Sequence, residues 1–140
     1  MKYSIPKFWR RKEGYYQVLL TKCKDCGRAA YFTYIKCPYC GSSNIELVKS
    51  SGRGVVEEFA VSYNRAEGSE EYLPRIIALI KLSEGVRVVG ELVDVEPSEV
   101  SEGMEVEAVL RILSSDDPHG LIYYGLKFAP AIKKYSLSNE

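Results

Sequence analysis

The sequence has few of the residues on which catalysis depends. It contains one histidine, His119, and all four cysteines fall within one short segment. No G-x-S-x-G, H-E-x-x-H or Walker-type motif is present, so no nucleophile elbow, catalytic zinc helix or phosphate loop can be recognised. His119 stands between proline and glycine in the segment DDPHG, a composition typical of a turn. We therefore expect a protein that is not an enzyme.

Long apolar runs and a secretion signal are also lacking. No stretch approaches the roughly 20 apolar residues that cross a bilayer. At the N-terminus the basic residues follow the apolar ones, and no small-residue cleavage site comes after them, which argues against a signal peptide. Hydrophobic residues make up 46% and charged residues 27%, as in globular proteins. We expect a cytoplasmic, folded protein.

Net charge is zero, but the two signs are unevenly distributed. Residues 1–54 carry 11 Lys and Arg against 3 Asp and Glu, whereas residues 55–140 carry 8 against 16. A basic surface attracts phosphates and an acidic one repels them. The sequence thus indicates two modules, and a polyanion is expected to meet the first.

The cysteines form two C-x-x-C motifs, Cys23 with Cys26 and Cys37 with Cys40, separated by ten residues. In a chain without a secretion signal this pattern predicts a tetrathiolate metal site rather than disulfides. Four thiolates close the tetrahedral shell of Zn²⁺, which leaves no position for substrate and makes the site structural. An iron-sulfur electron carrier of rubredoxin type and a dithiol redox pair are the alternatives, because iron accepts the same ligands.

The segment around these motifs, residues 15–50, predicts a zinc ribbon. Tyr16, Val18 and Leu20 alternate into the first motif, and Ile45 and Leu47 alternate out of the second, as in half-buried strands. A ribbon this small depends on its metal to fold.

The rest of the chain predicts a five-stranded barrel over residues 51–130, followed by a tail at 131–140. The expected strands are residues 55–62, 75–82, 86–92, 104–113 and 121–128, each rich in β-branched or aromatic residues. Residues 97–103 allow one helical turn that ends at a glycine. Five strands with a helical element between the third and fourth indicate an OB-fold, with an SH3-like barrel as the alternative.

Residues 1–14 predict a short N-terminal helix, with Ser4 as its cap and Gly14 as its end. Eight or nine residues are marginal for an isolated helix, so its apolar face must pack on something. That face includes Phe8 and Trp9, which either pack on the protein's own barrel or anchor a partner, since aromatic residues dominate interface hot spots.

The order of helix, four-cysteine ribbon and barrel resembles a family formerly classed as a domain of unknown function, which joins a rubredoxin-like zinc ribbon to an OB-fold. The matching segments are Phe8 with Trp9 and residues 21–28, 37–42, 51–54 and 103–104. The resemblance implies binding of acyl-CoA and association with a thiolase and with hydroxymethylglutaryl-CoA synthase. The family usually carries Pro-Pro-Arg before the second cysteine pair. Here Phe32-Thr33-Tyr34 stands instead, and Lys36, two residues further on, is expected to take the place of that arginine at a CoA phosphate.

Two functions fit these observations. The first is a non-catalytic scaffold that binds acyl-CoA and docks on thiolase-type enzymes; the second is single-stranded nucleic-acid binding, which OB-folds and zinc ribbons both perform. The acidic barrel disfavours nucleic acid, and the basic first module suits either ligand; the family resemblance favours coenzyme A. The residues expected to contact its phosphates are Lys24, Arg28, Lys36 and Arg53, and those expected to contact its adenine or pantetheine are Tyr31, Phe32 and Tyr34.

Overall fold

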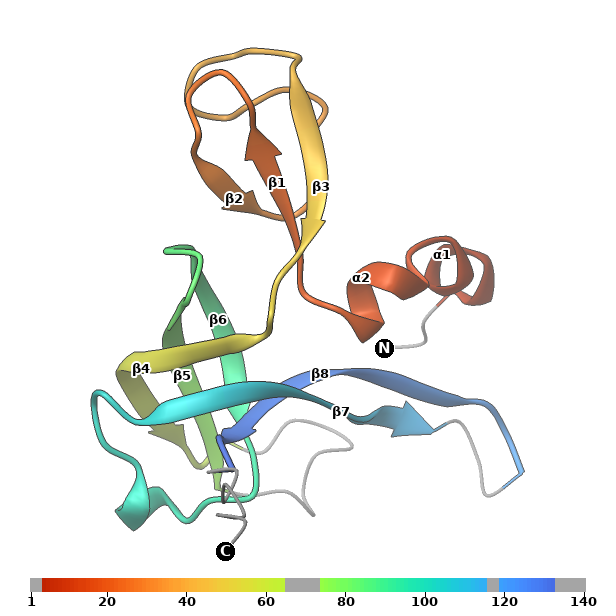
Figure 1. The fold of residues 1–140 in the computed structure, drawn as a ribbon. Coiled ribbons are helices and arrows are strands. Elements are labelled where there is room, and N and C mark those ends of the chain that lie inside the picture. The colour runs from red at the N-terminus through yellow and green to blue at the C-terminus, as the bar shows by residue number, and fades with distance from the viewer. Residues whose placement is uncertain (1–3, 65–73, 116–118, 133–140) are drawn as a thin grey trace, which may run out of the picture.

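The computed structural model describes residues 4–64, 74–115 and 119–132. In this part of the chain two short helices come first, a three-stranded ribbon follows, and a closed barrel of five strands completes the fold (Figure 1). The fold is therefore mainly β, as the sequence predicts.

The ribbon is an antiparallel sheet with β1 (Leu19–Cys23) between β2 (Ala29–Tyr31) and β3 (Ile45–Lys49). The register places Leu20 opposite both Tyr31 and Val48. β3 occupies the segment expected from the alternating pattern, although Leu47 is 56% exposed rather than half-buried. β1 begins only at Leu19, and Tyr16, which was expected in this strand, is the last residue of the helix Lys12–Tyr16, so that part of the prediction is wrong. β2 was not expected, because three residues are too few to show a period of two.

The barrel contains β4 (Arg53–Ser62), β5 (Arg75–Leu82), β6 (Arg87–Leu92), β7 (Glu105–Ser115) and β8 (Ile122–Pro130). Their order around the barrel is β4-β5-β6-β8-β7, and β6 meets β8 in parallel where Leu92 lies opposite Phe128. A short 3₁₀ helix, η2 (Pro97–Glu99), lies between β6 and β7, where one helical turn was expected. This connectivity identifies an OB-fold and excludes the SH3-like alternative.

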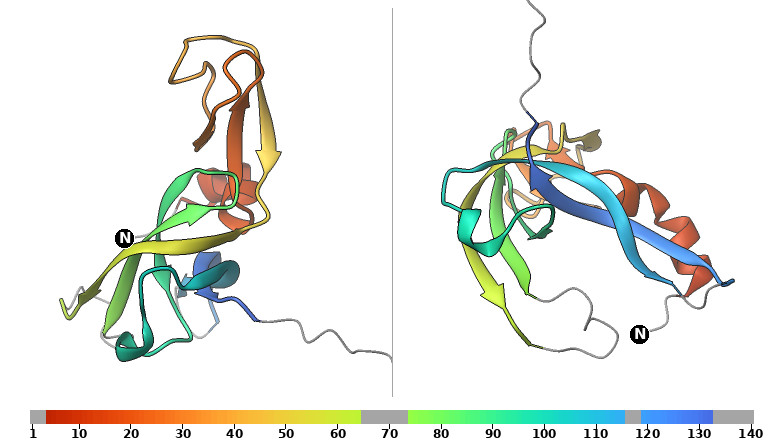
Figure 2. Two further views of the ribbon diagram at one scale, coloured as in Figure 1. Left: turned by 60° about the vertical axis from the view of Figure 1, so that its left-hand side comes forward. Right: turned by 90° about the horizontal axis from the view of Figure 1, so that it is seen from below.

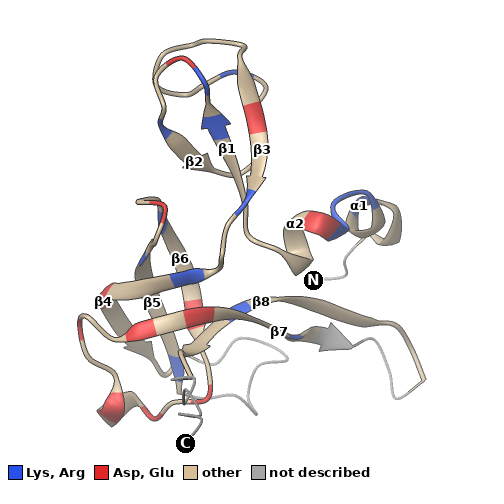
Figure 3. Ribbon diagram, viewed as in Figure 1, with Lys and Arg blue, Asp and Glu red and all other residues tan. Residues whose placement is uncertain are grey.

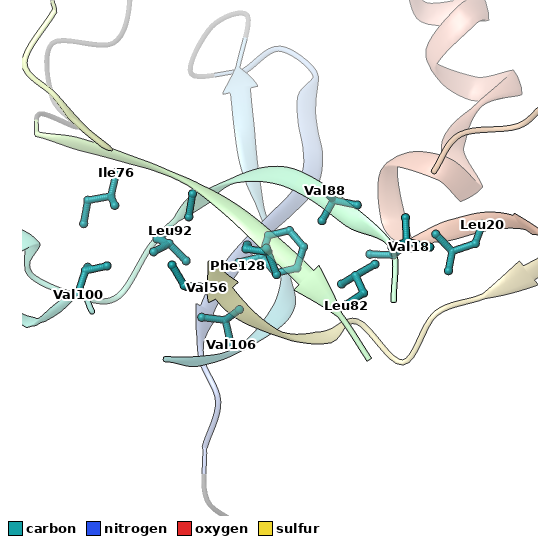
Figure 4. Close-up of a cluster of buried hydrophobic side chains, with 13 residues drawn as sticks. Val18, Leu20, Val56, Ile76, Leu82, Val88, Leu92, Val100, Val106 and Phe128 are labelled. Atoms are coloured by element: carbon teal, nitrogen blue, oxygen red, sulfur yellow. The ribbon is translucent and has the colours of Figure 1, made fainter. Parts of the chain in front are cut away.

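Ribbon and barrel share one hydrophobic core. Val18 and Leu20, 5% and 0% exposed, belong to the same buried cluster as Leu82 and Val88 of the barrel, and Figure 4 shows them at the end of this cluster. A second connection is polar: the Glu84 carboxylate accepts hydrogen bonds from the Ser50 hydroxyl (2.8 Å) and the Ser51 N–H (3.0 Å). The two modules are therefore joined by packing and by hydrogen bonds as well as by the chain.

The N-terminal segment forms two helices, α1 (Ile5–Arg10) and α2 (Lys12–Tyr16), rather than one that ends at Gly14. Gly14 lies inside α2, so its prediction as the stop is wrong; the helix continues because Tyr15, one residue further on, stacks on Phe8. Both helices lie beside the extended ends of β7 and β8 (Figures 1 and 2). Neither helix, nor any other in the described part of the chain, has the length and apolar character that a membrane crossing requires.

Candidate metal centre and ligand surface

The four cysteine sulfurs meet at the end of the ribbon farthest from the barrel. All four Sγ atoms lie within 4.8 Å of one another, with Cys23 and Cys40 at 3.5 Å and Cys26 and Cys37 at 3.6 Å. Cys23 and Cys37 are buried, whereas Cys26 and Cys40 are exposed. Sulfurs at about 2.3 Å from a tetrahedral zinc lie roughly 3.7 Å from each other, so this arrangement fits the ion.

Each cysteine pair sits on a tight turn that needs a glycine. Gly27 and Gly41 both have φ of +73°, the left-handed region that glycine occupies without a steric penalty. Their N–H groups donate to the carbonyls of Cys23 (3.1 Å) and Cys37 (3.0 Å). Hydrogen bonds, above all from the backbone N–H groups of Cys40 and Tyr39, lower the pKa of the Cys37 thiol to about 6, whereas the pKa values of Cys26 and Cys40 are raised, so without a metal the negative charge of the four sulfurs is concentrated on Cys37.

The donor set determines what this centre can do. Four thiolates would hold one zinc ion and leave no coordination position open, so the ion would supply folding energy rather than Lewis-acid chemistry. These are the four cysteines expected as ligands from their spacing.

Asp25, which the sequence did not single out, ties the two turns together. Its carboxylate accepts hydrogen bonds from the Ser42 hydroxyl and from the Asn44 side-chain amide (3.1 Å). These two hydrogen bonds lower the pKa of Asp25. In addition, the Lys24 N–H donates to the Asn44 carbonyl at 3.0 Å. These hydrogen bonds link the two cysteine turns to each other independently of a metal ion.

Thr21 organises the loop between the cysteine pairs. It is 2% exposed, and its hydroxyl donates to the Phe32 carbonyl (2.7 Å) and accepts from the Tyr34 N–H (3.2 Å). Phe32 adopts φ of +78°, a strained conformation for a residue with a side chain, yet its ring is 65% exposed. An aromatic ring is therefore held outward at a cost in backbone strain.

The residues expected to bind coenzyme A lie in three places. Lys24 and Arg28 flank the metal end: the Lys24 ammonium is 3.7 Å from the Glu46 carboxylate, and the Arg28 guanidinium lies over the Tyr39 ring at 5.3 Å. The basic first module and the acidic second module of the sequence are also distinct in the structure: acidic residues gather on the barrel (Figure 3).

The aromatic residues form the second place. Tyr31 and Phe32 have ring centroids 4.3 Å apart, and Tyr31 also packs on the core that ribbon and barrel share. Burial raises the pKa of Tyr31. Tyr34 and Lys36 follow on the same exposed loop. The structure thus brings Tyr31 and Phe32 together at the barrel-facing end of β2.

Arg53 stands apart in the third place, on the barrel. It lines a cavity of about 400 Å³ together with Lys81 and Glu105. Sequence spacing alone gave no sign of Lys81, which reaches this cavity from β5.

Phe8 and Trp9, the residues predicted to anchor a partner, have different surroundings. The Phe8 ring stacks on Tyr15 at 4.4 Å and meets the buried Tyr123 ring of β8 edge to face at 5.2 Å. Trp9 is 69% exposed, with the Lys12 ammonium 4.1 Å above its ring. Phe8 is therefore engaged within the protein, and Trp9 is the member of the pair that faces outward.

Two family profiles match consecutive parts of the chain. Residues 16–46 match the one described as "ChsH2, rubredoxin-like zinc ribbon domain", and residues 47–111 match "ChsH2, C-terminal OB-fold domain". A relative from Pyrococcus furiosus, named "DUF35 domain-containing scaffold protein", is 42% identical over 130 residues, which are 93% of this chain and 95% of the relative. A protein of the same name from Methanocaldococcus jannaschii is 36% identical over 90% of each chain.

A solved structure named "Ltp2-ChsH2(DUF35) aldolase" has a similar fold. It aligns with a TM-score of 0.68 over 94% of this chain and 98% of its own, at 24% identity. At that identity the likeness shows the fold and no more. The two family profiles describe a zinc ribbon followed by an OB-fold, which is the order of modules seen in this structure.

Proposed function

The chain belongs to the DUF35 family of zinc-ribbon and OB-fold proteins, and from this premise we propose that it is a non-catalytic scaffold that docks on a thiolase and lines part of an acyl-CoA site. Relatives that match this chain over almost their full length are named scaffold proteins, and none of those names describes a reaction. The metal centre has a closed shell of donors, which suits a structural role. Hydroxymethylglutaryl-CoA synthase is the second enzyme that such a scaffold would connect.

The observation that carries the acyl-CoA part is the exposed Phe32 ring. Strained backbone is retained where it serves a site, and here Thr21 is the buried residue that enforces it. Phe32 and Tyr34 would stack on adenine or flank the pantetheine arm. The Lys36 ammonium, on the same loop, would neutralise a phosphate. In this proposal the partner enzyme completes the site, because an exposed loop encloses no ligand by itself.

Docking is assigned to the N-terminal helices. Trp9 is exposed, and Arg10, Arg11 and Lys12 surround it with positive charge, so it suits a partner surface with an apolar pocket and an acidic rim. Because Phe8 packs on Tyr123, α1 is already held in place before a partner binds, which lowers the entropic cost of association.

The test uses the zinc-loaded chain and the thiolase encoded in the same genome. Light scattering after gel filtration should show one complex, and equilibrium dialysis with acetyl-CoA should show tighter binding to the complex than to the thiolase alone. Trp9→Ala should weaken the complex by roughly 2 kcal/mol or more, a loss of hot-spot size, without lowering the melting temperature of the free chain. Separate elution of the two proteins would overturn docking.

Phe32→Gly separates ligand binding from stability. Glycine accepts φ of +78° without strain, and this relief offsets the higher entropy of glycine in the unfolded chain and the lost contact with the Tyr31 ring, so the free energy of unfolding should change by less than about 1 kcal/mol, while acetyl-CoA binding to the complex falls. Unchanged acetyl-CoA affinity would remove Phe32 from the site.

Nucleic-acid binding is the second candidate, and it rests on the common use of OB-folds for this purpose. The excess of acidic residues in the barrel half of the sequence opposes a phosphate backbone. A fluorescent single-stranded oligonucleotide should therefore show no salt-dependent binding at micromolar concentration. Binding that weakens steeply with added salt would favour this alternative.

A further inference from the structure

The ends of β7 and β8 extend beyond the barrel as a two-stranded arm, comprising residues 108–115 and 122–127 (Figure 1). One face of this arm continues the interior face of the barrel outward. In the register, buried Phe128 lies opposite Ala108, then Leu126 opposite Leu110, and Tyr124 opposite Ile112. Residues directly opposite each other point to the same side, so the core-facing row runs on into solvent.

Beyond the barrel this row is apolar, and its side chains are partly exposed. Leu110 is 47% exposed, Ile112 52%, Ile122 48% and Tyr124 37%. Positions 108, 110, 112, 122, 124 and 126, which make up this face of the arm, include no charged residue. We call the four exposed side chains the arm patch.

The opposite face of the arm is covered by the protein itself. Tyr123 alternates with Ile122 and Tyr124, so it points the other way, and it is 5% exposed beneath Phe8 of α1. The two helices therefore pack against this face of the arm and, among the described elements, lie on one of its sides, as Figures 1 and 2 show.

The β7 edge of the arm is open as well. β7 pairs with β4 only from Glu105 to Glu107, and one further hydrogen bond joins the Ala108 N–H to the Gly52 carbonyl at 2.8 Å. Within the described residues, β7 beyond that point pairs with β8 alone. Of the elements that the structure describes, the helices contact β8, through α2 and through Phe8 against Tyr123, and this leaves the β7 edge as the accessible one. Unpaired strand edges beside apolar faces favour strand addition by another chain.

We propose that an extended, uncharged segment of the partner enzyme adds to the β7 edge and places its apolar side chains on the arm patch. This inference rests on the proposed scaffold function. The absence of charge from the patch selects an apolar partner segment and contrasts with the basic surroundings of Trp9, so the arm is a second contact of different chemistry.

A second copy of this chain fits the patch less well. The four side chains expose on the order of 400 Å², about half of the roughly 800 Å² per partner that a stable interface buries. A self-paired patch would therefore be too small alone. A partner that also engages Trp9 and gains main-chain hydrogen bonds along β7 would supply the missing area.

The experiment uses the full zinc-loaded chain with the thiolase of the proposed function. Hydrogen exchange of the amides at residues 109–113 should slow at least tenfold in the complex. Ile112→Lys should weaken thiolase binding at least tenfold, because the lysine must be desolvated against an apolar segment. Ile77→Lys is the matched control: Ile77 is 42% exposed on β5, away from the arm, and this change should alter affinity less than twofold.

The outcomes separate the two proposals. Suppose that Trp9→Ala weakens the complex, but Ile112→Lys binds as tightly as wild type and residues 109–113 gain no protection from exchange. This result overturns the arm inference and leaves the proposed scaffold function intact. No complex with wild-type chain overturns both. If the free chain dimerises and Ile112→Lys makes it monomeric, the arm patch binds a second copy of this chain, and the inference is also overturned. Should Ile112→Lys lower the melting temperature, the wild-type exchange pattern decides alone.

Discussion

Removing the Thr21 hydroxyl should loosen the loop that carries Phe32. Thr21→Val keeps the shape of the side chain but abolishes both hydrogen bonds, to the Phe32 carbonyl at 2.7 Å and from the Tyr34 N–H at 3.2 Å. Each neutral hydrogen bond contributes about 1 kcal/mol, and each partner left unpaired in a partly buried place adds to the loss. We expect a decrease of about 2–3 kcal/mol in the free energy of unfolding, and faster exchange of the Tyr34 amide.

Thr21→Ser provides the control. Serine retains the hydroxyl and loses one buried methyl group, which costs about 1 kcal/mol. Urea unfolding followed by circular dichroism, on zinc-loaded protein, gives both values. The reasoning is refuted if the valine variant is as stable as wild type, or if serine is the more damaging of the two substitutions.

Three further predictions concern the metal, the junction and the core. Wild type should bind one zinc per chain, whereas Cys37→Ser should bind none, lose exchange protection first at the metal end of the ribbon and, because Val18 and Leu20 belong to the shared core, also lower the stability of the barrel; a red, iron-loaded protein would contradict this. Partial burial raises the pKa of Glu84, but hydrogen bonds from the Ser51 N–H and the Ser50 hydroxyl lower it overall, below its ordinary 4.5. The stability advantage of wild type over Glu84→Gln, about 1 kcal/mol after solvent screening, should therefore be present above pH 4.5 and vanish as pH falls further, and an advantage independent of pH would refute the role of the charge. Leu20→Ala should cost about 3 kcal/mol and destabilise both modules together, which two separate unfolding transitions would disprove.

The sequence was most informative where a local pattern determines structure. Barrel strands were predicted within two residues of their observed ends, because alternating β-branched residues and glycine-containing turns act locally. The cysteine spacing likewise predicted the metal centre, since two C-x-x-C turns can present four sulfurs to one ion.

Contacts between segments that are distant in the chain could not be predicted from the sequence. No neighbouring residue in the sequence indicates that Val18 and Leu20 pack in the barrel core. Likewise, none indicates that the Glu84 carboxylate accepts hydrogen bonds from Ser50 and Ser51. Glycine is common at the end of a helix, yet α2 continues beyond Gly14 because Tyr15 stacks on Phe8. Such tertiary contacts override local preference.

Photoaffinity labelling shows directly whether this chain lines the acyl-CoA site. The complex of this chain with its thiolase is irradiated in the presence of an acyl-CoA that carries a diazirine on its acyl or adenine end, and the labelled peptides are mapped. We expect label on the loop at residues 31–36 of this chain, and we expect acetyl-CoA to compete with it and Phe32→Gly to abolish it. If all of the label lies on the thiolase and none on this chain, this chain does not line the acyl-CoA site.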